Sequence, residues 1–434
     1  MKNRKPWNVL VFPGGTENGL EINKSLRYAK EVILFSASSG VKNHAELMYE
    51  NHFVIPEVKN ETCLIELNEI IRANSIDFVF PANSLVIDFL IKNRSCLGCR
   101  VVLPENNSVI ISRSKTATYK LFENKINIPR TYKNINEIEK YPVFIKPDAL
   151  YGSQGVMKIN SAEQFENINI DLKNYIISDY LSGEEFTIEC FASKKNGLMY
   201  SMARTRERIR MGTSMRSEKA NKEIQKETEI VAKIIQATLK FDGLWFFQMK
   251  LDENNILKLL EIETRVAGTM AFSRCLGVNL PLANLYLIEG INVKINPQKF
   301  DIIIDRSLAN RYITNIEYDT VYVDLDHTII LDEKLNLDLI KFIYQCINRE
   351  IRIILISKSI AKNKIKYLKK FKIYQLFDEI IWLNENDSKA DYIINKNSIF
   401  IDDSFSQRLE VEDKLGIPTF EPNMIEVLLN EKTK

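Results

Sequence analysis

Histidine is scarce in this sequence, and its scarcity limits the chemistry that the chain can perform. The 434 residues include three histidines, His44, His52 and His327. So few imidazoles argue against His-rich metal sites and against Ser-His-Asp catalysis. We therefore expect carboxylates and lysines to carry any catalytic function.

Long apolar runs and an excess of charge of one sign are also missing. No apolar run approaches the roughly 20 residues that a membrane helix needs, and residues 1–6 lead directly into a short strand-like run. The 59 basic and 57 acidic side chains nearly cancel, so the charge balance favours neither nucleic acid nor an acidic membrane as a partner. We expect a soluble, cytoplasmic protein that binds neither.

Two short motifs that often mark cofactor sites are incomplete. Cys96 and Cys99 form a single C-x-x-C among six scattered cysteines, and without a second pair, buried or loop thiols are the better expectation. Gly14-Gly15 precedes a helical pattern where an anion could bind. It lacks the G-x-G-x-x-G spacing of dinucleotide-binding loops, so we do not expect a dinucleotide there.

The first hundred residues alternate short apolar runs with helical patterns, and the chain length suggests about two to four domains. The expected strands cover residues 8–12, 32–35, 53–55, 78–80 and 100–103. This alternation is typical of a parallel, doubly wound α/β sheet.

A predicted β-hairpin further along brings several polar side chains together. Apolar runs at 246–251 and 259–265 are joined by the turn-like Asp252-Glu-Asn-Asn. Residues two apart in a strand share a face, so Glu261, Glu263 and Arg265 project together, and Gln248 can lie beside them. Carboxylate and amide oxygens suit Mg²⁺. A solvated face on an amphipathic hairpin is the alternative.

A lysine and a glycine-rich loop precede this hairpin. The predicted strand 142–147 contains Lys146, and the loop 151–156 follows it. Glycines let backbone N–H groups approach a phosphate, and Lys146 supplies a compact positive charge. A simple glycine turn between strands is the alternative.

Together these pieces resemble the ATP-grasp superfamily in their order and separation. The resemblance is carried by Lys115, Lys146 with its Gly-Ser-Gln-Gly loop, the segment Gly-Glu-Glu185-Phe-Thr, and Gln248 with Glu261-x-Glu263-x-Arg265. It covers about residues 1–300 and implies a Rossmann-like pre-ATP-grasp domain at 1–112 and an ATP-grasp α+β domain at 113–300. One departure is Glu263, because many members have Asn at this position.

The resemblance assigns ATP and Mg²⁺ as cofactors and gives roles to individual residues. Lys115 and Lys146 would contact ATP phosphates, and Gly152, Ser153 and Gly155 would belong to the loop that closes over them. Tyr180 and Leu181 would lie by the adenine, and Glu185 would accept the ribose hydroxyls. Gln248, Glu261 and Glu263 would bind Mg²⁺.

The same resemblance implies a carboxylate ligase. In that superfamily a carboxylate attacks the γ-phosphate, and an amine or another nucleophile captures the acyl phosphate. Guanidinium groups bind carboxylates bidentately, so Arg206, Arg208 and Arg265 are candidates to hold the acid, with Arg265 also catalytic. A solvated basic strand at 204–210 is the alternative. Relatives are often homodimers.

A second α/β series begins after a linker expected at 301–317. An apolar strand delivers Asp324 and Asp326, with Thr328 close behind, and a second strand ends at Ser357. Lys389 and the pair Asp402-Asp403 follow. Sites in parallel sheets lie at the carboxyl ends of strands, where these residues stand.

This order of motifs resembles the haloacid dehalogenase superfamily of phosphatases over about residues 318–434. The resemblance makes Asp324 the nucleophile and Asp326 the general acid/base. Ser357 and Lys389 would hold the phosphoryl oxygens, and Thr328 would contact substrate. The implied Mg²⁺ ligands are Asp324, Asp326, Asp402 and Asp403. His327 stands where relatives often have glycine.

About thirty residues separate Asp326 from Ser357, and a similar number separate Ser357 from Lys389. These intervals leave no room for a large cap, so we predict a capless, doubly wound domain. Together, the two resemblances imply a bifunctional biosynthetic ligase and phosphatase that acts on a small-molecule carboxylate, an amine or a phosphorylated metabolite. An ATP-dependent kinase or carbamoyl-phosphate-type enzyme, and a nucleotide-binding regulatory pseudoenzyme, are alternatives compatible with the same motifs.

Overall fold

The computed structural model describes residues 5–148, 155–168, 172–210, 212–358, 363–430 and 432. The chain divides into two compact units, residues 1–308 with 432–434 and residues 309–431. The boundary between the two units, after residue 308, falls inside the segment 301–317 that we expected to be a linker.

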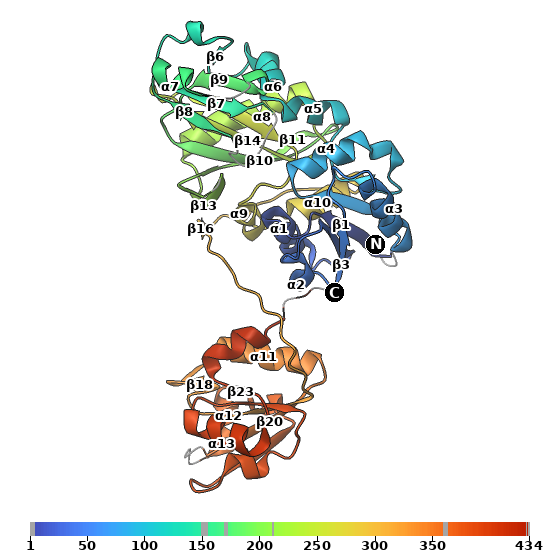
Figure 1. Ribbon diagram of the computed structural model, residues 1–434, viewed down its shortest axis with the longest axis vertical. Coiled ribbons are helices and arrows are strands. Elements are labelled where there is room, and N and C mark those ends of the chain that lie inside the picture. Colours follow the sequence, from blue (N-terminus) through green and yellow to red (C-terminus); the bar gives the residue numbers. More distant parts are fainter. Residues whose placement is uncertain are drawn as a thin grey trace. The chain divides into compact units, whose positions relative to one another are not determined.

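The first unit begins with the parallel sheet that the sequence predicts, in the strand order β3-β2-β1-β4-β5 (Figure 1). Its strands are β1 (Trp7–Phe12), β2 (Val32–Ser39), β3 (Asn51–Ile55), β4 (Phe78–Pro81) and β5 (Arg100–Val101). The connecting helices are α1 (Glu17–Leu26), α2 (Ala45–Met48), α3 (Cys63–Ala73) and α4 (Ser84–Lys92).

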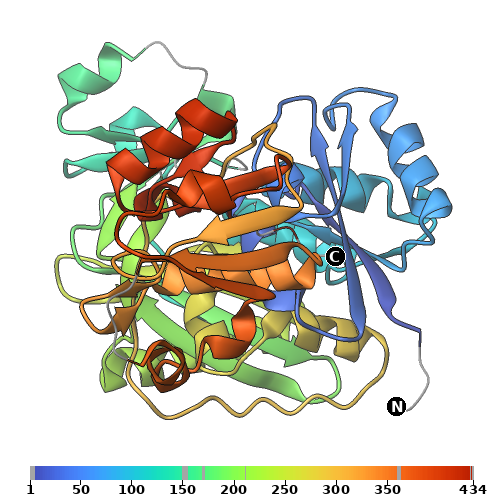
Figure 2. The ribbon, with the colours of Figure 1, turned by 90° about the horizontal axis from the view of Figure 1, so that it is seen from below.

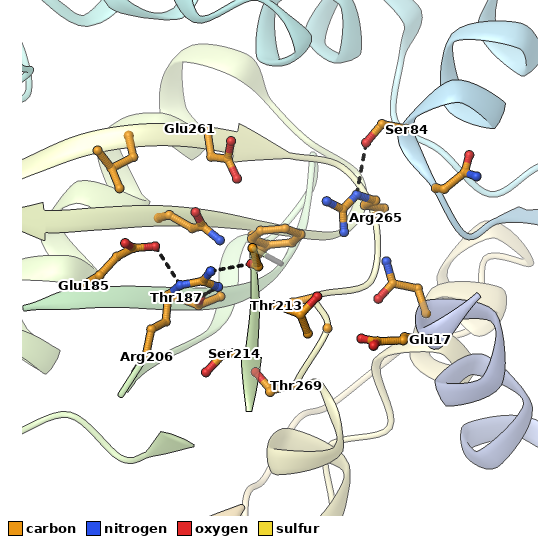
Figure 3. A pocket seen from close by; sticks show the side chains of 18 of the residues that line it. Glu17, Ser84, Glu185, Thr187, Arg206, Thr213, Ser214, Glu261, Arg265 and Thr269 are labelled. Atoms are coloured by element: carbon orange, nitrogen blue, oxygen red, sulfur yellow. Dashed lines mark hydrogen bonds and ion pairs between the residues drawn. The ribbon is translucent and has the colours of Figure 1, made fainter. Parts of the chain in front are cut away.

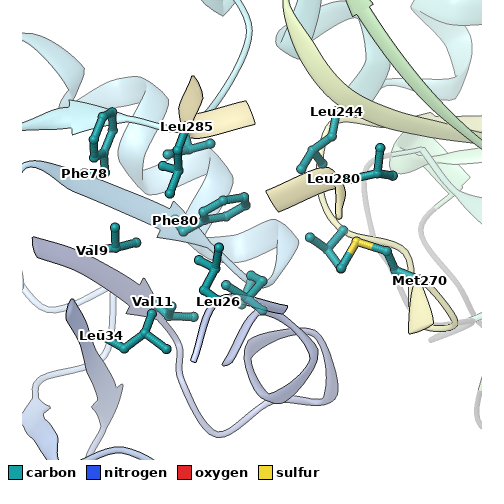
Figure 4. Packing of buried hydrophobic residues seen from close by; sticks show 14 of the residues in the cluster. Val9, Val11, Leu26, Leu34, Phe78, Phe80, Leu244, Met270, Leu280 and Leu285 are labelled. Atoms are coloured by element: carbon teal, nitrogen blue, oxygen red, sulfur yellow. The ribbon is translucent and has the colours of Figure 1, made fainter. Parts of the chain in front are cut away.

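Both faces of this sheet are buried, because alternate residues of β1 enter two different cores. Val9 and Val11 pack in one core together with Leu26 of α1 (Figure 4). Leu10 and Phe12 pack on the opposite face with residues of α3 and α4. The first core also contains Leu244, Met270, Leu280 and Leu285. Residues 1–112 therefore share a core with later parts of the unit.

Two antiparallel sheets form most of the remainder. One has the order β11-β10-β14-β15, and α8 packs against it. Its elements are β10 (Glu185–Ser193), β11 (Gly197–Thr205), β14 (Gly243–Leu251), β15 (Leu257–Glu263) and α8 (Lys222–Leu239). The other has the order β6-β9-β7-β8 and consists of β6 (Thr131–Tyr132), β7 (Val143–Pro147), β8 (Met157–Ile159) and β9 (Tyr175–Asp179), with α7 (Ala162–Glu166) beside it. The hairpin predicted at 246–265 is β14–β15.

Short elements complete the first unit. The helices α5 (Asn106–Arg113) and α6 (Lys115–Phe122) precede the antiparallel sheets, and α9 (Ala271–Cys275) and α10 (Leu280–Ile288) follow them. A small sheet has the order β12-β13-β16, with β12 (Arg208–Arg210), β13 (Thr213–Glu218) and β16 (Ile303–Asp305). Because β16 pairs with β13, residues 303–305 belong to the unit and not to a linker.

The second unit contains a parallel sheet of order β21-β20-β17-β22-β23, drawn in orange and red in Figures 1 and 2. Its strands are β17 (Thr320–Val323), β20 (Arg352–Ser357), β21 (Glu379–Trp382), β22 (Ser398–Ile401) and β23 (Thr419–Phe420). Separate cores cover its two faces, since Val321 and Val323 pack in one and Tyr322 in the other. The predicted doubly wound sheet is therefore present.

The intervals beside the second-unit strands are filled by small elements. Between Asp326 and Ser357 lie the hairpin β18 (Ile330–Leu331) and β19 (Lys334–Leu335), then α11 (Leu337–Asn348) and β20. Helices α12 (Lys364–Lys370) and α13 (Phe405–Leu415) come later. Within the described ranges of both units, every helix is too short or too polar to span a lipid bilayer.

Candidate functional site

A cavity of about 500 Å³ lies in the first unit, where the parallel sheet and the two antiparallel sheets contribute side chains (Figure 3). Its wall includes Lys115 at the start of α6, Lys146 in β7, and Gln248 and Glu261 from the hairpin β14–β15. These four expected residues line the same cavity, although Lys115 and Glu261 lie more than a hundred positions apart in the sequence.

The two lysines have different surroundings. Lys146 is 6 % exposed, and its Nζ donates a hydrogen bond to Tyr119 Oη at 2.7 Å. Burial lowers the pKa of Lys146 to about 8. Lys115 Nζ lies 3.8 Å from Glu261 Oε2 and 3.4 Å from the carbonyl oxygen of Asp148. Both cations are thus held by the protein at the cavity wall.

Gln248 and Glu261 are directly opposite each other in the antiparallel ladder. When the Gln248 amide is oriented so that both its atoms are satisfied, its nitrogen donates to Glu261 Oε1 at 3.1 Å and its oxygen accepts from Arg206 at 3.0 Å. In this orientation the amide oxygen of Gln248 faces Arg206, and Glu261 supplies the carboxylate oxygens, which are donors that fit Mg²⁺. Glu261 therefore suits the metal role that the resemblance implies, and Gln248 would have to turn its amide to join it.

Glu263 differs from this expectation, because it lies outside the cavity wall. Its side chain is buried, with Oε1 3.4 Å from Arg113 Nη1 and Oε2 3.4 Å from Arg265 Nε. Arg113 also pairs with Asp88 at 2.9 Å, and Arg265 Nε donates to Ser84 Oγ at 3.3 Å. The extra negative charge at 263 therefore faces two guanidinium groups. The sequence pattern placed Glu263 beside Glu261 but did not show these partners.

The three candidate arginines separate in space. Arg206 and Arg265 line the cavity (Figure 3). Arg206 Nε pairs with Glu185 Oε1 at 2.7 Å, so the residue expected at the ribose is already bound to an arginine. Arg208 is exposed and pairs with Asp305 at 2.7 Å, outside the cavity wall. It does not join the other two.

Tyr180, Leu181 and Gly155, which were expected near the adenine and in the phosphate loop, are not among the residues that line the cavity. The Tyr180 ring is 6.2 Å from that of Phe144, a wall residue, and Leu181 is buried. Gly155 adopts φ +68°, a conformation that favours glycine. Gly152 and Ser153 lie outside the described residues.

Several wall residues escaped the sequence analysis. Thr16 and Glu17 follow β1, and Asn83 and Ser84 follow β4. The carboxyl ends of parallel strands are where such sheets bind ligands, so this position was a usable signal. Arg204 lies in the basic segment 204–210 but was not chosen as a candidate site residue. It is fully buried and pairs bidentately with Glu189, at 2.9 and 3.1 Å.

In the second unit, three expected residues form a buried cluster at the carboxyl ends of the strands. Lys389 Nζ donates to Asp324 Oδ1 and to Asp402 Oδ2, both at 2.6 Å. Burial raises the pKa of Asp324 to about 6, although Lys389 opposes the shift. Burial alone would lower the pKa of Lys389, but attraction to the two carboxylates outweighs it and the pKa is raised.

The remaining second-unit candidates surround this cluster. Thr328 Oγ1 accepts from the backbone N–H of Asp403 at 3.0 Å and donates to Asp403 Oδ1 at 3.2 Å. Ligand atoms of Asp324, Asp402 and Asp403 lie within 4.8 Å of one another, a spacing that fits a divalent cation. Ser357 is buried at the end of β20, and Asp326 is half-buried.

His327 has a backbone conformation that glycine adopts more readily. Its φ is +60°, in the left-handed region. Non-glycine residues at such angles carry a steric cost.

Comparisons with known proteins bear on the fold of the first unit. A family model described as "ATP-grasp in the biosynthetic pathway with Ter operon" matches residues 171–308. The biotin carboxylase domain of 2-oxoglutarate carboxylase from Hydrogenobacter thermophilus, solved with MgADP, ADP and bicarbonate, is 13% identical with a TM-score of 0.57. The similarity covers 68% of this chain and 72% of that one. The fold is that of ATP-grasp proteins.

Two further relatives are ligases. The D-alanine--D-alanine ligase of Fusobacterium nucleatum is 28% identical over 193 residues, which are 44% of this chain and 62% of that protein. The chain thus spans about three-fifths of the length of this curated relative. L-amino acid ligase from Bacillus licheniformis is 14% identical with a TM-score of 0.53, over 66% of this chain and 75% of the other. The predicted resemblance to ATP-grasp proteins is confirmed at the level of the fold.

Proposed function

We propose that the first unit is an ATP-dependent carboxylate–amine ligase that forms ADP through an acyl phosphate. The observation that carries this proposal is the convergence of Lys115, Lys146 and Glu261 with two arginines, Arg206 and Arg265, on one cavity. Groups suited to bind a polyphosphate and an acid therefore share a single space. The fold common to the ligase relatives supports it.

The reaction needs binding and orientation from the chain and no protein nucleophile. A substrate carboxylate oxygen bonds to the γ-phosphorus as the bond to ADP breaks. The amine nitrogen then bonds to the acyl carbon, inorganic phosphate leaves, and the nitrogen loses a proton. Lys115 and Lys146 offset the negative charge of the transferring phosphoryl group, and Arg265 orients the acid.

Mg²⁺ bound by Gln248 and Glu261 would neutralise phosphate charge. We assign Glu263 to the two arginines beside it, and not to the metal, because both of its oxygens face guanidinium groups. Glu185, with Tyr180 and Leu181, remains our proposal for the nucleoside side of the site. Arg208 is left out, since it pairs with Asp305 away from the cavity.

Amino acids are the first substrates to test, because the relatives include a D-alanine--D-alanine ligase and an L-amino acid ligase. L- and D-amino acids are supplied with ATP and Mg²⁺, singly and in pairs, and ADP is measured by a coupled assay. Release accompanied by formation of a dipeptide, from one amino acid or from a pair, supports ligation. Release with a single acid and no dipeptide supports a kinase, and ADP binding without turnover with any substrate supports a regulatory protein.

The matched variants for this assay are Glu261→Gln and Glu253→Gln, which lie on the same hairpin. Glu261 lines the cavity, whereas Glu253 is exposed at the turn. We expect Glu261→Gln to reduce ADP release at least about a hundredfold, as loss of a charge-stabilising group does. Glu253→Gln should match the wild type. Equal rates for the two variants would refute the role of Glu261.

We propose as a second activity that residues 309–431 hydrolyse phosphate monoesters. The observation that favours it is the buried Lys389 ammonium bridging Asp324 and Asp402 at 2.6 Å each. Asp324 Oδ would bond to phosphorus as the ester bond breaks, and Asp326 would protonate the leaving oxygen. Water then cleaves the aspartyl phosphate. Mg²⁺ held by Asp324, Asp402 and Asp403 would offset the phosphate charge.

Hydrolysis of p-nitrophenyl phosphate tests this second activity. Asp324→Asn should abolish it, while Asp413→Asn, at an exposed position of α13, should leave it unchanged. Hydrolysis that persists in Asp324→Asn would remove Asp324 from the nucleophile role.

A homodimer is also proposed, in line with the biotin carboxylase domain dimer among the structural relatives, and sedimentation velocity tests it.

A further inference from the structure

Tyr119 connects parts of the cavity that come from different elements. It lies one helical turn after Lys115 in α6 and is 3% exposed. Its hydroxyl accepts a hydrogen bond from Lys146 Nζ of β7 at 2.7 Å and donates one to the carbonyl oxygen of Leu260 in β15 at 2.9 Å. One side chain thus joins two sheets beside two cavity lysines.

The hydrogen bonds of the hydroxyl have a fixed direction. Burial raises the pKa of Tyr119, so the phenol stays protonated. Its single proton goes to the Leu260 carbonyl, since a carbonyl can only accept. The oxygen lone pair is therefore left for the Lys146 ammonium, which can only donate while charged.

The location of Leu260 gives this contact a consequence for the site. Leu260 immediately precedes Glu261, and both line the cavity with Lys146. The chain Lys146–Tyr119–Leu260 therefore fixes the distance between the phosphate-binding lysine and the strand that carries the proposed metal ligand. Without the hydroxyl, the flexible lysine stem has several rotamers available at little cost.

We propose that Tyr119 is a positioning residue of the nucleotide site, whose hydroxyl holds the Lys146 ammonium at the cavity so that it meets the polyphosphate of a nucleoside di- or triphosphate. This inference rests on the proposed function of the first unit. It adds a residue that supports phosphate binding without touching the phosphates.

The test measures ADP binding with Mg²⁺ by isothermal titration calorimetry in the full chain and in Tyr119→Phe. The substitution keeps the buried ring and removes only the hydroxyl. The substitution removes a hydrogen bond to a charged group, so we expect Tyr119→Phe to bind ADP about tenfold more weakly. In a Lys146→Met background the same substitution should have no further effect, because the hydroxyl acts through Lys146.

A matched control is Tyr132→Phe. Tyr132 is also a buried tyrosine, and its hydroxyl donates to Asp179 at 2.6 Å within the sheet β6-β9-β7-β8. Its phenol is outside the cavity wall. We expect this variant to lose some thermal stability and to bind ADP like the wild type.

The pH profile separates positioning from a structural role. Lys146 is faced by Tyr119 and Lys115 of α6, Glu261 of β15, Glu185 of β10 and Asp148 after β7. The Tyr119 hydroxyl accepts from the charged Lys146 amine and so favours its charged form. In Tyr119→Phe this acceptor is lost, and the fall of ADP affinity at alkaline pH should begin about one pH unit lower. A merely structural role would not move this midpoint.

The outcomes are distinct. Unchanged affinity and an unchanged pH profile in Tyr119→Phe would overturn the inference while leaving the nucleotide site intact. Failure of Tyr119→Phe to fold would also overturn it, since the hydroxyl would then act in folding. Absence of ADP binding by the wild-type chain would overturn the proposed nucleotide site, and this inference with it.

Discussion

The buried Lys146 makes nucleotide binding sensitive to alkaline pH. Burial lowers its pKa from the usual 10.5 to about 8. A bound polyphosphate would favour the charged amine, so the free protein must take up a proton on binding above pH 8. ADP affinity should change little well below the Lys146 midpoint and fall by up to about tenfold per pH unit above it.

Calorimetric titration with ADP and Mg²⁺ between about pH 7.0 and 9.5 measures this fall directly. This range extends from about one unit below to about 1.5 units above the midpoint of Lys146. Unfolding does not account for it. The folded pKa of Lys146 is depressed, so stability from this group rises as pH increases from about 8 toward 10.5 and is lost as pH falls through 8. Lys146→Met should bind weakly with no alkaline fall. A flat wild-type profile to pH 9.5 would refute the account of Lys146.

Further predictions concern stability and the assignment of individual residues. Arg204→Met removes one partner of the fully buried pair with Glu189 and should lower the free energy of unfolding by about 3–5 kcal/mol in urea titrations. Lys233→Met, in an exposed i,i+4 pair, should change it by less than about 0.5 kcal/mol, and similar losses would contradict the burial argument. Arg206→Ala should raise the KM of the acid substrate about tenfold or more, whereas Arg208→Ala should not change it, and the reverse order would exchange their roles.

The hairpin was predictable because strand alternation is a local property. Gln248 and Glu261 face each other as the two-residue period requires, and the turn at Asp252 brings their strands together. Glu263 obeys the same alternation, but its partner Arg113 lies 150 residues earlier, on α5. A local pattern cannot identify a counterion supplied by another element.

The basic segment 204–210 shows where the two-residue alternation of side chains in a strand fails as a guide. Arg206 and Arg208 are two residues apart and would share a face in a continuous strand. In the structure β11 ends at Thr205, β12 begins at Arg208, and the pairing register shifts after Arg208. The break sends Arg206 into the cavity and Arg208 toward Asp305.

The central claim is that the first unit transfers a phosphoryl group to a substrate carboxylate. The most direct test uses the acid that supports ADP release, labelled with ¹⁸O in its carboxylate, together with ATP, Mg²⁺ and the amine. Mass spectrometry of the inorganic phosphate released should find one ¹⁸O atom per phosphate, because the carboxylate oxygen stays on phosphorus when the amine displaces it. Unlabelled phosphate accompanying formation of the amide would contradict the acyl-phosphate mechanism.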